Sequence, residues 1–378
     1  MGNVRIYSKS TVYEAASKRI EWLFDEFPNV VVSVSGGKDS TVIFYLTLEV
    51  ARRRNRLPLN VLFVDQEGEW ESTIENVREI MYRPDVTPYW LQVPLKLFNA
   101  AAHNEHWLTS WDENCKEDWV HPQDPISYKD NVYGKSRFSE IFDAAIAYHF
   151  KDIPTANIGG VRADENPTRL VGLTFQPTYK WATWGKKLNP NMGHYTFYPI
   201  YDWAMSDVWH YIVSNDLSYN RLYDMQYRYG VHLRSMRVSN LFHEVAVYQL
   251  FYLQEFEGAT YAKLAKRLQG IDAAGKAGAD DYFVTDELPF MFESWREYRD
   301  YLLEHLIDNP EWRQRMARRF VKNDYDLGEI LGATKYKRQI QSILTHDWEG
   351  IKIANFRSSG QARKAADIMK KERAEANV

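Results

Sequence analysis

The chain has 378 residues, of which 45% are hydrophobic and 26% charged, which is typical of a globular protein with one or two domains. Its formal net charge of -4 gives no overall attraction to nucleic acid, and its single cysteine, Cys115, excludes an internal disulfide framework or a four-cysteine zinc site. No apolar run is long enough to span a membrane, and the N-terminus lacks the apolar segment of a secretory signal. These features predict a cytoplasmic protein without a membrane partner.

The first elements in the chain are an amphipathic helix over residues 11–27, capped by Ser10 or Thr11, and an apolar strand that leads into a glycine turn and a second helix. Residues 29–40, which contain this turn, read NVVVSVSGGKDS. Glycine lets the backbone take positive φ and pass close to a ligand, and the free N–H groups at the start of the next helix face that ligand. The pattern predicts an anion site. Its candidate nucleotide-binding residues are Ser33, Ser35, Gly36, Gly37, Lys38, Asp39 and Ser40.

The glycine turn lacks the GxxxxGK[ST] and GxGxxG patterns, so it is neither a Walker A loop nor a dinucleotide fingerprint. A plain strand, polar turn and helix would explain a bare glycine pair. The hexapeptide SGGKDS after a hydrophobic strand, however, resembles the PP-loop of the ATP pyrophosphatases. That family includes sulfate adenylyltransferase small subunits, tRNA-thiolation enzymes and, with looser loops, phosphoadenosine phosphosulfate (PAPS) reductases. The resemblance favours nucleotide binding.

A second buried strand over residues 59–64 ends at Asp65, and a third is expected over 88–93 after a helix that ends at Tyr82. Strands that alternate with helices predict a parallel α/β sheet, in which ligands lie at the carboxyl ends of the strands. Asp65 occupies such an end and is a candidate to orient a ribose hydroxyl or a magnesium ion, although a single carboxylate is equally typical of a turn. The segment VLFVD resembles the nucleotide-binding second strand of the PAPS reductases, which favours the functional interpretation.

The insertion over residues 95–137 is irregular and rich in tryptophan, histidine and aspartate. Its candidate zinc ligands, His103, His106, Cys115 and His121, match no standard zinc spacing. We therefore interpret so long an insertion as a substrate lid or a pocket wall built from aromatic side chains, with zinc binding as the alternative.

A helix over residues 138–150 leads to a fourth strand, 155–160, that ends at Gly160. Arg162 and Arg169 follow, and two guanidinium groups beside a strand end can hold a phosphate or a sulfate through bidentate hydrogen bonds. The alternative is a surface turn in which each arginine pairs with a neighbouring carboxylate. The segment GVRADENPTR resembles the G-[IV]-R-x-x-E-x-x-x-R segment of PAPS reductase-type proteins, so we expect these residues to belong to the site.

A fifth strand is expected over residues 196–200, followed by a helix with Ser206 or Asp207 as its cap. The segment PIYDW followed by DVWHYI resembles a second signature of the same family. We interpret its aromatic and aliphatic residues as packing, because a motif that identifies a family need not carry the chemistry.

The pattern is mainly helical from residue 217 onward, so we predict an α/β domain over residues 1–215 and a helical region over 216–378. The helices expected in this region cover 246–256, 261–268, 294–306 and 311–322. A linker is expected at 276–281, and the tail over 363–373 mixes both signs of charge and is expected to be mobile. Basic clusters here favour solvated helix faces, with contact to nucleic acid or a partner as the alternative.

The motifs between residues 28 and 260 together resemble the PAPS reductase-like proteins, and most closely the type named after immunoglobulin-binding regulator A, which are PAPS sulfurtransferase-like. The resemblance implies an adenine nucleotide α-hydrolase-like fold with a five-stranded parallel sheet between helices. It also implies an adenine nucleotide as ligand and a ParB-like protein as partner, and similar relatives act in DNA phosphorothioation. One departure stands out: thioredoxin-dependent PAPS reductases carry a catalytic cysteine near the C-terminus, and no cysteine follows Cys115 here.

This departure favours ATP over PAPS as the nucleotide, because a reductase needs a nucleophilic thiolate. We predict cleavage of ATP between the α and β phosphates, transfer of the adenylyl group to an oxyanion such as sulfate, and release of pyrophosphate. The candidate catalytic residues are Lys38, Asp39, Arg162 and Arg169, with Asp39 as a ligand of Mg²⁺. The alternatives are a reductase or sulfurtransferase acting on PAPS or adenosine phosphosulfate (APS), and a nucleotide-binding regulator that acts with a ParB-like partner or DNA.

Overall fold

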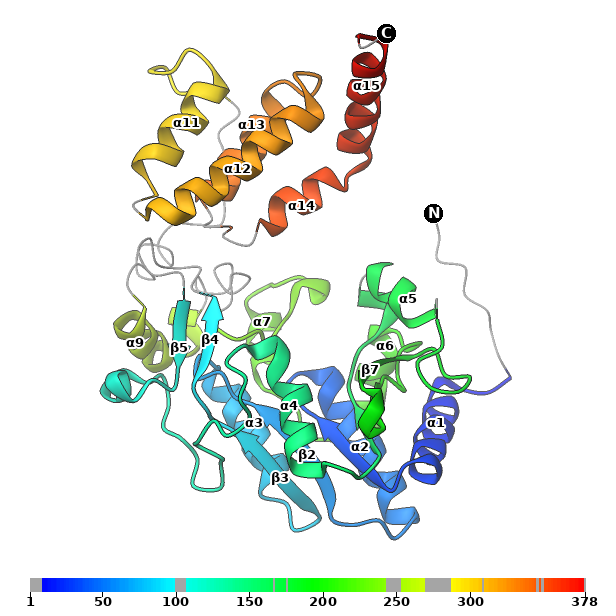
Figure 1. The fold of residues 1–378 in the computed structure, drawn as a ribbon. Helices are drawn as coiled ribbons and strands as arrows, with labels where there is room; N and C mark the ends of the chain where they lie inside the picture. Colours follow the sequence, from blue (N-terminus) through cyan, green and yellow to red (C-terminus); the bar gives the residue numbers. More distant parts are fainter. Residues whose placement is uncertain are drawn as a thin grey trace. The chain divides into compact units, whose positions relative to one another are not determined.

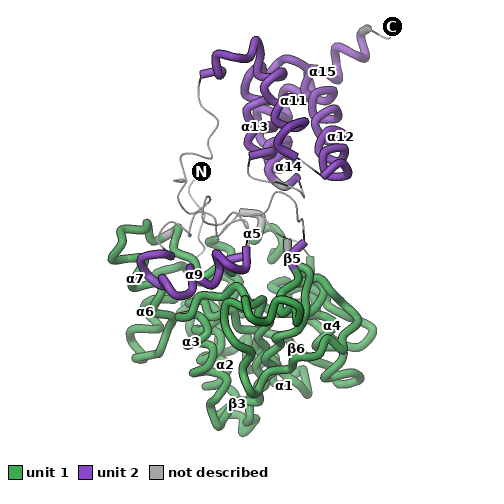
Figure 2. The backbone as a smooth tube through the Cα atoms, turned by 90° about the vertical axis from the view of Figure 1, so that its left-hand side faces the viewer, with its two compact units in different colours: residues 1–96, 109–240 green, residues 97–108, 241–378 purple. Residues whose placement is uncertain are grey.

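The computed structural model of the chain describes residues 9–98, 107–165, 167–174, 176–242, 253–268, 287–307, 309–344, 347 and 350–376. Two compact units are present, the first made of residues 1–96 and 109–240 and the second of 97–108 and 241–378. Figure 2 colours the first unit green and the second purple. Within the described ranges, no helix has both the length and the apolar character that are needed to cross a membrane.

The first unit is organised around a six-stranded sheet with the order β3-β2-β1-β6-β8-β7. Figure 1 shows the first unit with β2, β3 and β7 of this sheet labelled. The strands are β1 (Asn29–Ser33), β2 (Leu59–Val64), β3 (Val86–Leu91), β6 (Thr155–Ile158), β7 (Gly185–Asn189) and β8 (His194–Phe197). All of them except β7 run parallel to their neighbours. The predicted α/β fold, with a parallel sheet flanked by helices, is therefore confirmed, and its third and fifth strands begin two residues earlier than predicted.

One strand of the sheet corrects the prediction of five strands. β7 pairs antiparallel with β8 at the edge of the sheet, with Gly185 opposite Phe197. The strand reads GKKLN, and its two lysine side chains are exposed, so its sequence has too little strand propensity to be recognised. Lysine is common on edge strands because its charge discourages pairing with another chain. The sheet thus has five parallel strands and one antiparallel edge strand.

The helices of the first unit are α1 (Val12–Glu26), α2 (Lys38–Arg53), α3 (Glu71–Met81), α4 (Phe138–Phe150), α5 (Pro167–Thr174), α6 (Met205–Ser214) and α7 (Leu222–Arg228). α1 starts with a capping box, in which Thr11 Oγ1 accepts from the Glu14 amide (3.2 Å) and the Glu14 carboxylate accepts from the Thr11 amide (2.9 Å). The N-cap of α6 is Ala204, not the predicted Ser206 or Asp207. The Asp207 carboxylate instead reaches back from the first turn and accepts from the Ala204 amide at 2.7 Å.

The two faces of the sheet differ in polarity. On one face, apolar side chains of β1, β2 and β6 form a core with residues of α1, α2, α3 and α6. On the other face, Ser33 Oγ donates to Asn157 Oδ1 at 2.7 Å, and Asn157 Nδ2 donates to Thr196 Oγ1 at 3.1 Å. These bonds join β1, β6 and β8 and satisfy polar groups that would otherwise be buried without partners.

The insertion over residues 95–137, predicted to be irregular, contains three short elements. They are β4 (Leu95–Phe98), β5 (Trp107–Ser110) and the 3₁₀ helix η1 (Glu113–Asp118), and the two strands pair with each other. Two of the four candidate zinc ligands, His103 and His106, lie outside the described residues. Among the residues with described positions, no group of three or more histidine, cysteine or acidic side chains is placed to hold a metal ion.

The second unit is mainly helical, and its described helices are α9 (Gly258–Arg267), α11 (Trp295–His305), α12 (Pro310–Leu327), α13 (Ala333–Leu344), α14 (Ile351–Arg357) and α15 (Gly360–Ala376). The helices predicted at 261–268, 294–306 and 311–322 correspond to α9, α11 and α12. Most of the predicted helix at 246–256 and the whole predicted linker at 276–281 lie outside the described residues.

Two regions differ from the predicted organisation of the C-terminal half. The charged tail forms α15, because Ala362 and Ala365 are buried against Leu327 of α12 and give the helix an apolar contact. Residues 216–240, which the sequence placed with the helical region, belong by their contacts to the first unit.

Candidate active site

The SGGKDS loop, residues 35–40, lies at the carboxyl edge of the sheet, where the strand order changes direction. In the chain β1 is followed by β2 and β3 on one side, whereas β6 and β8 lie on the other side of β1. The loop therefore adjoins the switch point between β1 and β6, which is where open parallel α/β sheets bind ligands. α2 begins at Lys38, directly after the two glycines, so the N-terminal end of this helix lies at this edge.

The two glycines of the loop have different backbone roles. Gly36 has a φ of +70°, and a Cβ atom there would lie 2.5 Å from Thr73 Cγ2, so both conformation and space exclude other residues. Gly37 is the N-cap of α2 and has an extended backbone, with φ −88° and ψ 162°. A Cβ atom on Gly37 would lie 3.2 Å from Val238 Cγ2 and 3.4 Å from Tyr223 Oη. Only Gly36 therefore needs positive φ, a distinction that the sequence did not make.

Gly160, predicted as part of the site, lies just beyond the end of β6. A Cβ atom on Gly160 would lie 2.7 Å from the Asp39 carbonyl carbon and oxygen and 2.8 Å from the Ser40 amide nitrogen. These neighbours are backbone atoms of the first turn of α2, which cannot move aside as a flexible side chain can. Gly160 thus allows the end of β6 to pack directly on the loop.

The serines of the loop region hold its shape. Ser40 Oγ donates to the Gly37 carbonyl at 2.8 Å and accepts from the Ser35 amide at 3.1 Å, and Ser35 Oγ lies 3.2 Å from it. Ser33 lies one step earlier and is bonded to Asn157 within the sheet. The structure therefore brings Ser35 and Ser40 together at the loop, while the hydroxyl of Ser33 is engaged between strands.

The charged residues of the loop form a compact ionic group. The Asp39 carboxylate lies between two cations, with Lys38 Nζ at 3.0 Å from Oδ2 and Arg162 Nε at 2.5 Å from Oδ1. The Arg162 side chain is only 4% exposed, and its Nη1 also donates to the Trp203 carbonyl at 3.4 Å. Its distances to the Asp164 and Glu165 carboxylates are longer, at 3.8 Å each. Arg162 is therefore a buried partner of the loop and not a surface turn residue.

Arg169, the second predicted arginine, lies on α5 and is half exposed. Its guanidinium pairs with the Glu165 carboxylate. Burial lowers the pKa of Arg169, the charges of Tyr198 and Asp39 raise it, and the charges of Arg162 and Arg237 contribute a smaller lowering. The three arginines thus share one electrostatic neighbourhood beside the loop. Arg237, which follows α7, was not among the predicted site residues.

The segment around α7 covers the start of α2 and was also missed as part of the site. Asn220 is fully buried, and its Nδ2 donates to the Gly36 carbonyl at 3.1 Å and to Thr73 Oγ1 at 2.9 Å. Tyr223 Oη accepts from the Lys38 amide at 3.2 Å. The segment YNRLYD has no local pattern that predicts these contacts, because they depend on where the chain returns after α6.

Asp65, the candidate ribose or magnesium ligand at the end of β2, is fully buried. Its Oδ2 accepts from Trp90 Nε1 at 3.1 Å and from Gln92 Nε2 at 2.8 Å, and its Oδ1 accepts from the Glu67 amide at 2.9 Å. His121 Nε2 lies 3.3 Å from Oδ1. The carboxylate is therefore surrounded by protein partners and is not open at the edge of the sheet.

Two further acidic side chains are buried beside Asp65. Glu67 Oε2 accepts from the Trp111 amide at 2.8 Å, and Trp111 Nε1 donates to the Asp65 carbonyl at 2.8 Å, so the insertion is tied to the end of β2. Glu69 Oε1 accepts from Asn240 Nδ2 at 2.8 Å. Burial, with a smaller contribution from the charge of Asp65, raises the pKa of Glu69 to about 8. A proton on Glu69 relieves the repulsion between neighbouring carboxylates.

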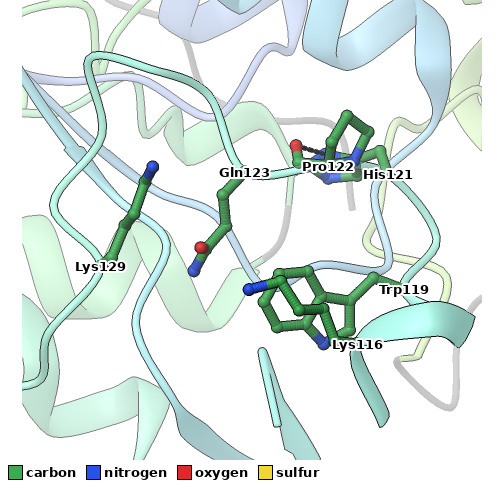
Figure 3. A pocket seen from close by; sticks show the side chains of 6 residues that line it. All are labelled: Lys116, Trp119, His121, Pro122, Gln123 and Lys129. Carbon is green, nitrogen blue, oxygen red and sulfur yellow. Dashed lines mark hydrogen bonds between the residues drawn. The ribbon is translucent and has the colours of Figure 1, made fainter. Parts of the chain in front are cut away.

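A cavity of about 410 Å³ lies within the insertion (Figure 3), and one of its lining residues, His121, is the neighbour of Asp65. It is lined by Lys116, Trp119, His121, Pro122, Gln123 and Lys129, all from the insertion. The ammonium of Lys116 lies 5.2 Å from the centre of the Trp119 ring. The expected pocket wall is thus partly aromatic, and it is separate from the ionic group of the loop.

A profile of the phosphoadenosine phosphosulfate reductase domain matches residues 29–229, more than half of the chain. The chain belongs to the phosphoadenosine phosphosulfate reductase domain family. The matched residues contain the loop, both predicted arginines and α7.

Three similar proteins have sequence identities between 17% and 31% to this PAPS reductase-domain protein. It is 31% identical to the uncharacterized protein YbdN of Escherichia coli over 325 residues. The aligned region covers 81% of this chain and 78% of YbdN. It is 21% identical over 220 residues to adenosine 5'-phosphosulfate reductase of Lysinibacillus sphaericus, and the aligned region covers 57% of this chain and 77% of that reductase. The solved structure of a PAPS reductase from Candida auris is 17% identical to this chain and has a TM-score of 0.32 to it. The match covers 59% of this chain and 94% of that reductase. This structural likeness is too weak to support a functional argument.

The position of the single cysteine, Cys115, bears on whether the chain can act as a thiol-dependent reductase. Cys115 is half-buried in η1, within the insertion, and not on the loop. The segment after α7, which packs over the loop, contains no cysteine.

Proposed function

We propose that this PAPS reductase-domain protein binds ATP at the SGGKDS loop, cleaves it between the α and β phosphates, and transfers the adenylyl group to an oxyanion acceptor. Sulfate is the proposed acceptor and pyrophosphate the leaving group. The observation that carries the proposal is the ionic group at the start of α2, in which Lys38 and Arg162 both contact the Asp39 carboxylate. Such a group offers two cations to an incoming phosphate at the positive end of a helix.

In the proposed reaction the phosphates replace the carboxylate as partner of the cations. The loop amides, Ser35, Ser40 and Lys38 bind the leaving pyrophosphate and stabilise the charge that develops on it. Arg162 and Arg169 bind the oxyanion acceptor or a phosphate of the nucleotide, since a guanidinium presents paired donors to a tetrahedral oxyanion. An anionic acceptor already carries its nucleophilic lone pair, so the transfer needs no general base.

Mg²⁺ is the metal that this reaction implies. Asp39 is the one acidic side chain of the loop, and the described part of the chain offers no group of three or more protein ligands. This donor set fits a magnesium ion that is held mainly by nucleotide phosphates and water, with Asp39 as a single protein ligand. When bound, the ion supplies charge neutralisation at the phosphates.

A reductase or sulfurtransferase acting on PAPS or APS is the alternative reaction for this family. Reduction requires a thiolate that attacks the sulfonyl group. Cys115, the only thiol, lies in η1 of the insertion, and the ionic group contains none. The position of Cys115 therefore supports ATP as the nucleotide.

The proposal extends to the subtype and its setting. We propose that the protein is of the immunoglobulin-binding regulator A type, that it acts in sulfur metabolism in the cytoplasm, and that a ParB-like protein is its partner. A regulator that binds nucleotide without turnover, with a partner or DNA, is the competing role. Measuring turnover with and without the partner distinguishes the two.

The test is release of pyrophosphate by the full chain. The chain is incubated with ATP, Mg²⁺ and sulfate, and a parallel sample receives PAPS or APS with a dithiol reductant. Pyrophosphate in the first sample supports adenylyl transfer. Sulfite in the second, with no pyrophosphate in the first, overturns it in favour of reduction.

A further inference from the structure

Tyr223 is the side chain of α7 that comes closest to the start of α2. It is only 4% exposed, and its Oη accepts from the Lys38 amide at 3.2 Å. The Lys38 ammonium lies 5.4 Å from the centre of the Tyr223 ring. A tyrosine hydroxyl thus stands at the helix terminus where a phosphate is expected.

The position of this hydroxyl is firmly held. The Trp209 ring meets the Tyr223 ring edge to face at 5.4 Å and 87°. Asn220 anchors the beginning of α7, since its Oδ1 accepts from the Leu222 amide at 2.9 Å while its Nδ2 is bonded to the loop. These contacts hold the Tyr223 ring at the start of α2.

The hydroxyl has an unused donor. A tyrosine O–H donates one hydrogen bond and accepts others. Tyr223 accepts from Lys38, but no described group accepts its proton. Burial raises the pKa of Tyr223, so the proton is retained at neutral pH. A buried donor without an acceptor is costly, which indicates that a ligand supplies the missing oxygen.

We propose that Tyr223 is a phosphate-binding residue that donates its hydroxyl proton to a pyrophosphate oxygen of the nucleotide while its oxygen holds the Lys38 amide. The inference rests on the proposed function, because it assumes a polyphosphate at the loop.

The experiment is calorimetric titration of the full chain with inorganic pyrophosphate and with ATP, both with Mg²⁺. Tyr223→Phe removes only the hydroxyl. We expect it to weaken pyrophosphate and ATP binding at least about tenfold, as for a lost hydrogen bond to a charged group. The matched control is Tyr219→Phe on the same segment, whose hydroxyl already donates to Asp224 Oδ1 at 2.8 Å, and it should bind within about twofold of the unmodified chain.

The outcomes separate this inference from the proposed function. If the unmodified chain binds neither ligand, nucleotide binding itself fails. If it binds both and Tyr223→Phe binds equally well or more tightly, the inference is overturned while the proposed function stands. Should Tyr223→Phe not fold, 3-fluorotyrosine placed at 223 or at 219 and observed by ¹⁹F NMR gives the answer. We expect pyrophosphate to shift the resonance of the label at 223 and to leave the resonance of the label at 219 unchanged. An unshifted resonance at 223 overturns the inference.

Discussion

The carboxyl ends of β1 and β2 lie side by side in the sheet, yet the charged side chains at the two ends have different partners. At the end of β1, Lys38 and Arg162 both contact the Asp39 carboxylate, and Arg162 also lies 3.8 Å from the Asp164 and Glu165 carboxylates. At the end of β2, three carboxylates are buried with His121, and tryptophan and glutamine side chains saturate Asp65. The first arrangement can accept an anion, whereas the second ties the insertion to the sheet. A carboxylate at a strand end is therefore not by itself a ligand-binding residue.

The largest effect is expected from a substitution at Gly160, where the end of β6 packs on the loop. We expect Gly160→Ala to abolish detectable ATP binding and to lower the free energy of unfolding by about 1–3 kcal/mol, because its Cβ would lie 2.7 Å from backbone atoms of Asp39. The matched control is Gly172→Ala on α5, where nothing lies within 4 Å of the added atom. Calorimetry and chemical denaturation measure both effects. Undiminished ATP binding by Gly160→Ala would contradict the packing described here.

The second largest effect is expected at the buried arginine. Arg162→Lys keeps the charge but loses the planar donors that reach Asp39 and the Trp203 carbonyl. We expect it to lower the rate of pyrophosphate release by about tenfold or more, since a hydrogen bond to a charged group contributes about 1.5–3 kcal/mol. Arg169→Lys tests the second arginine of the pair, and because Arg169 is half exposed we expect a smaller loss, below about fivefold. Equal losses in the two variants would remove the distinction between the buried and the exposed arginine.

The pH dependence of stability tests the acidic group at β2. The folded-state pKa of Glu69 is about 8, above its ordinary value of 4.5, so the folded protein holds a proton that the unfolded chain releases between these pH values. The contribution of this group to stability is complete below pH 4.5 and decreases as the pH rises toward 8. Glu69→Gln cannot ionise and keeps an acceptor for Asn240, so we expect its melting temperature to fall less between pH 5 and pH 8. Glu75→Gln, at an exposed position of α3, serves as the control, and parallel curves for all three proteins would contradict the assignment.

The smallest effect is expected at the cysteine. Cys115→Ser should leave pyrophosphate release unchanged within about twofold, because Cys115 lies in η1 and the proposed transfer uses no thiol. A complete loss of turnover in a folded Cys115→Ser protein would instead revive the reductase mechanism. Circular dichroism provides the check on folding.

The sequence by itself determined the fold class and the position of the loop. Apolar strands alternate with amphipathic helices, and that period alone predicts a parallel α/β sheet. The hexapeptide SGGKDS follows β1 and continues into the first turn of α2. Local propensity sufficed for these features because strand, turn and helix start are contiguous in the chain. It failed for β7, where the pairing with β8 supplies what GKKLN lacks in propensity.

Only the tertiary structure decided which charged and polar groups meet. Arg162 contacts Asp39 across more than a hundred residues, Tyr223 reaches the Lys38 amide from α7, and Asp65 is enclosed by Trp90 and Gln92. No local pattern encodes such contacts, since they depend on how the strands are ordered and where the chain returns to the loop. The same reason explains why Asp65 resembled a ligand in the sequence but is a buried partner in the fold. Burial and hydrogen bonding are properties of the assembled sheet, not of the residue type.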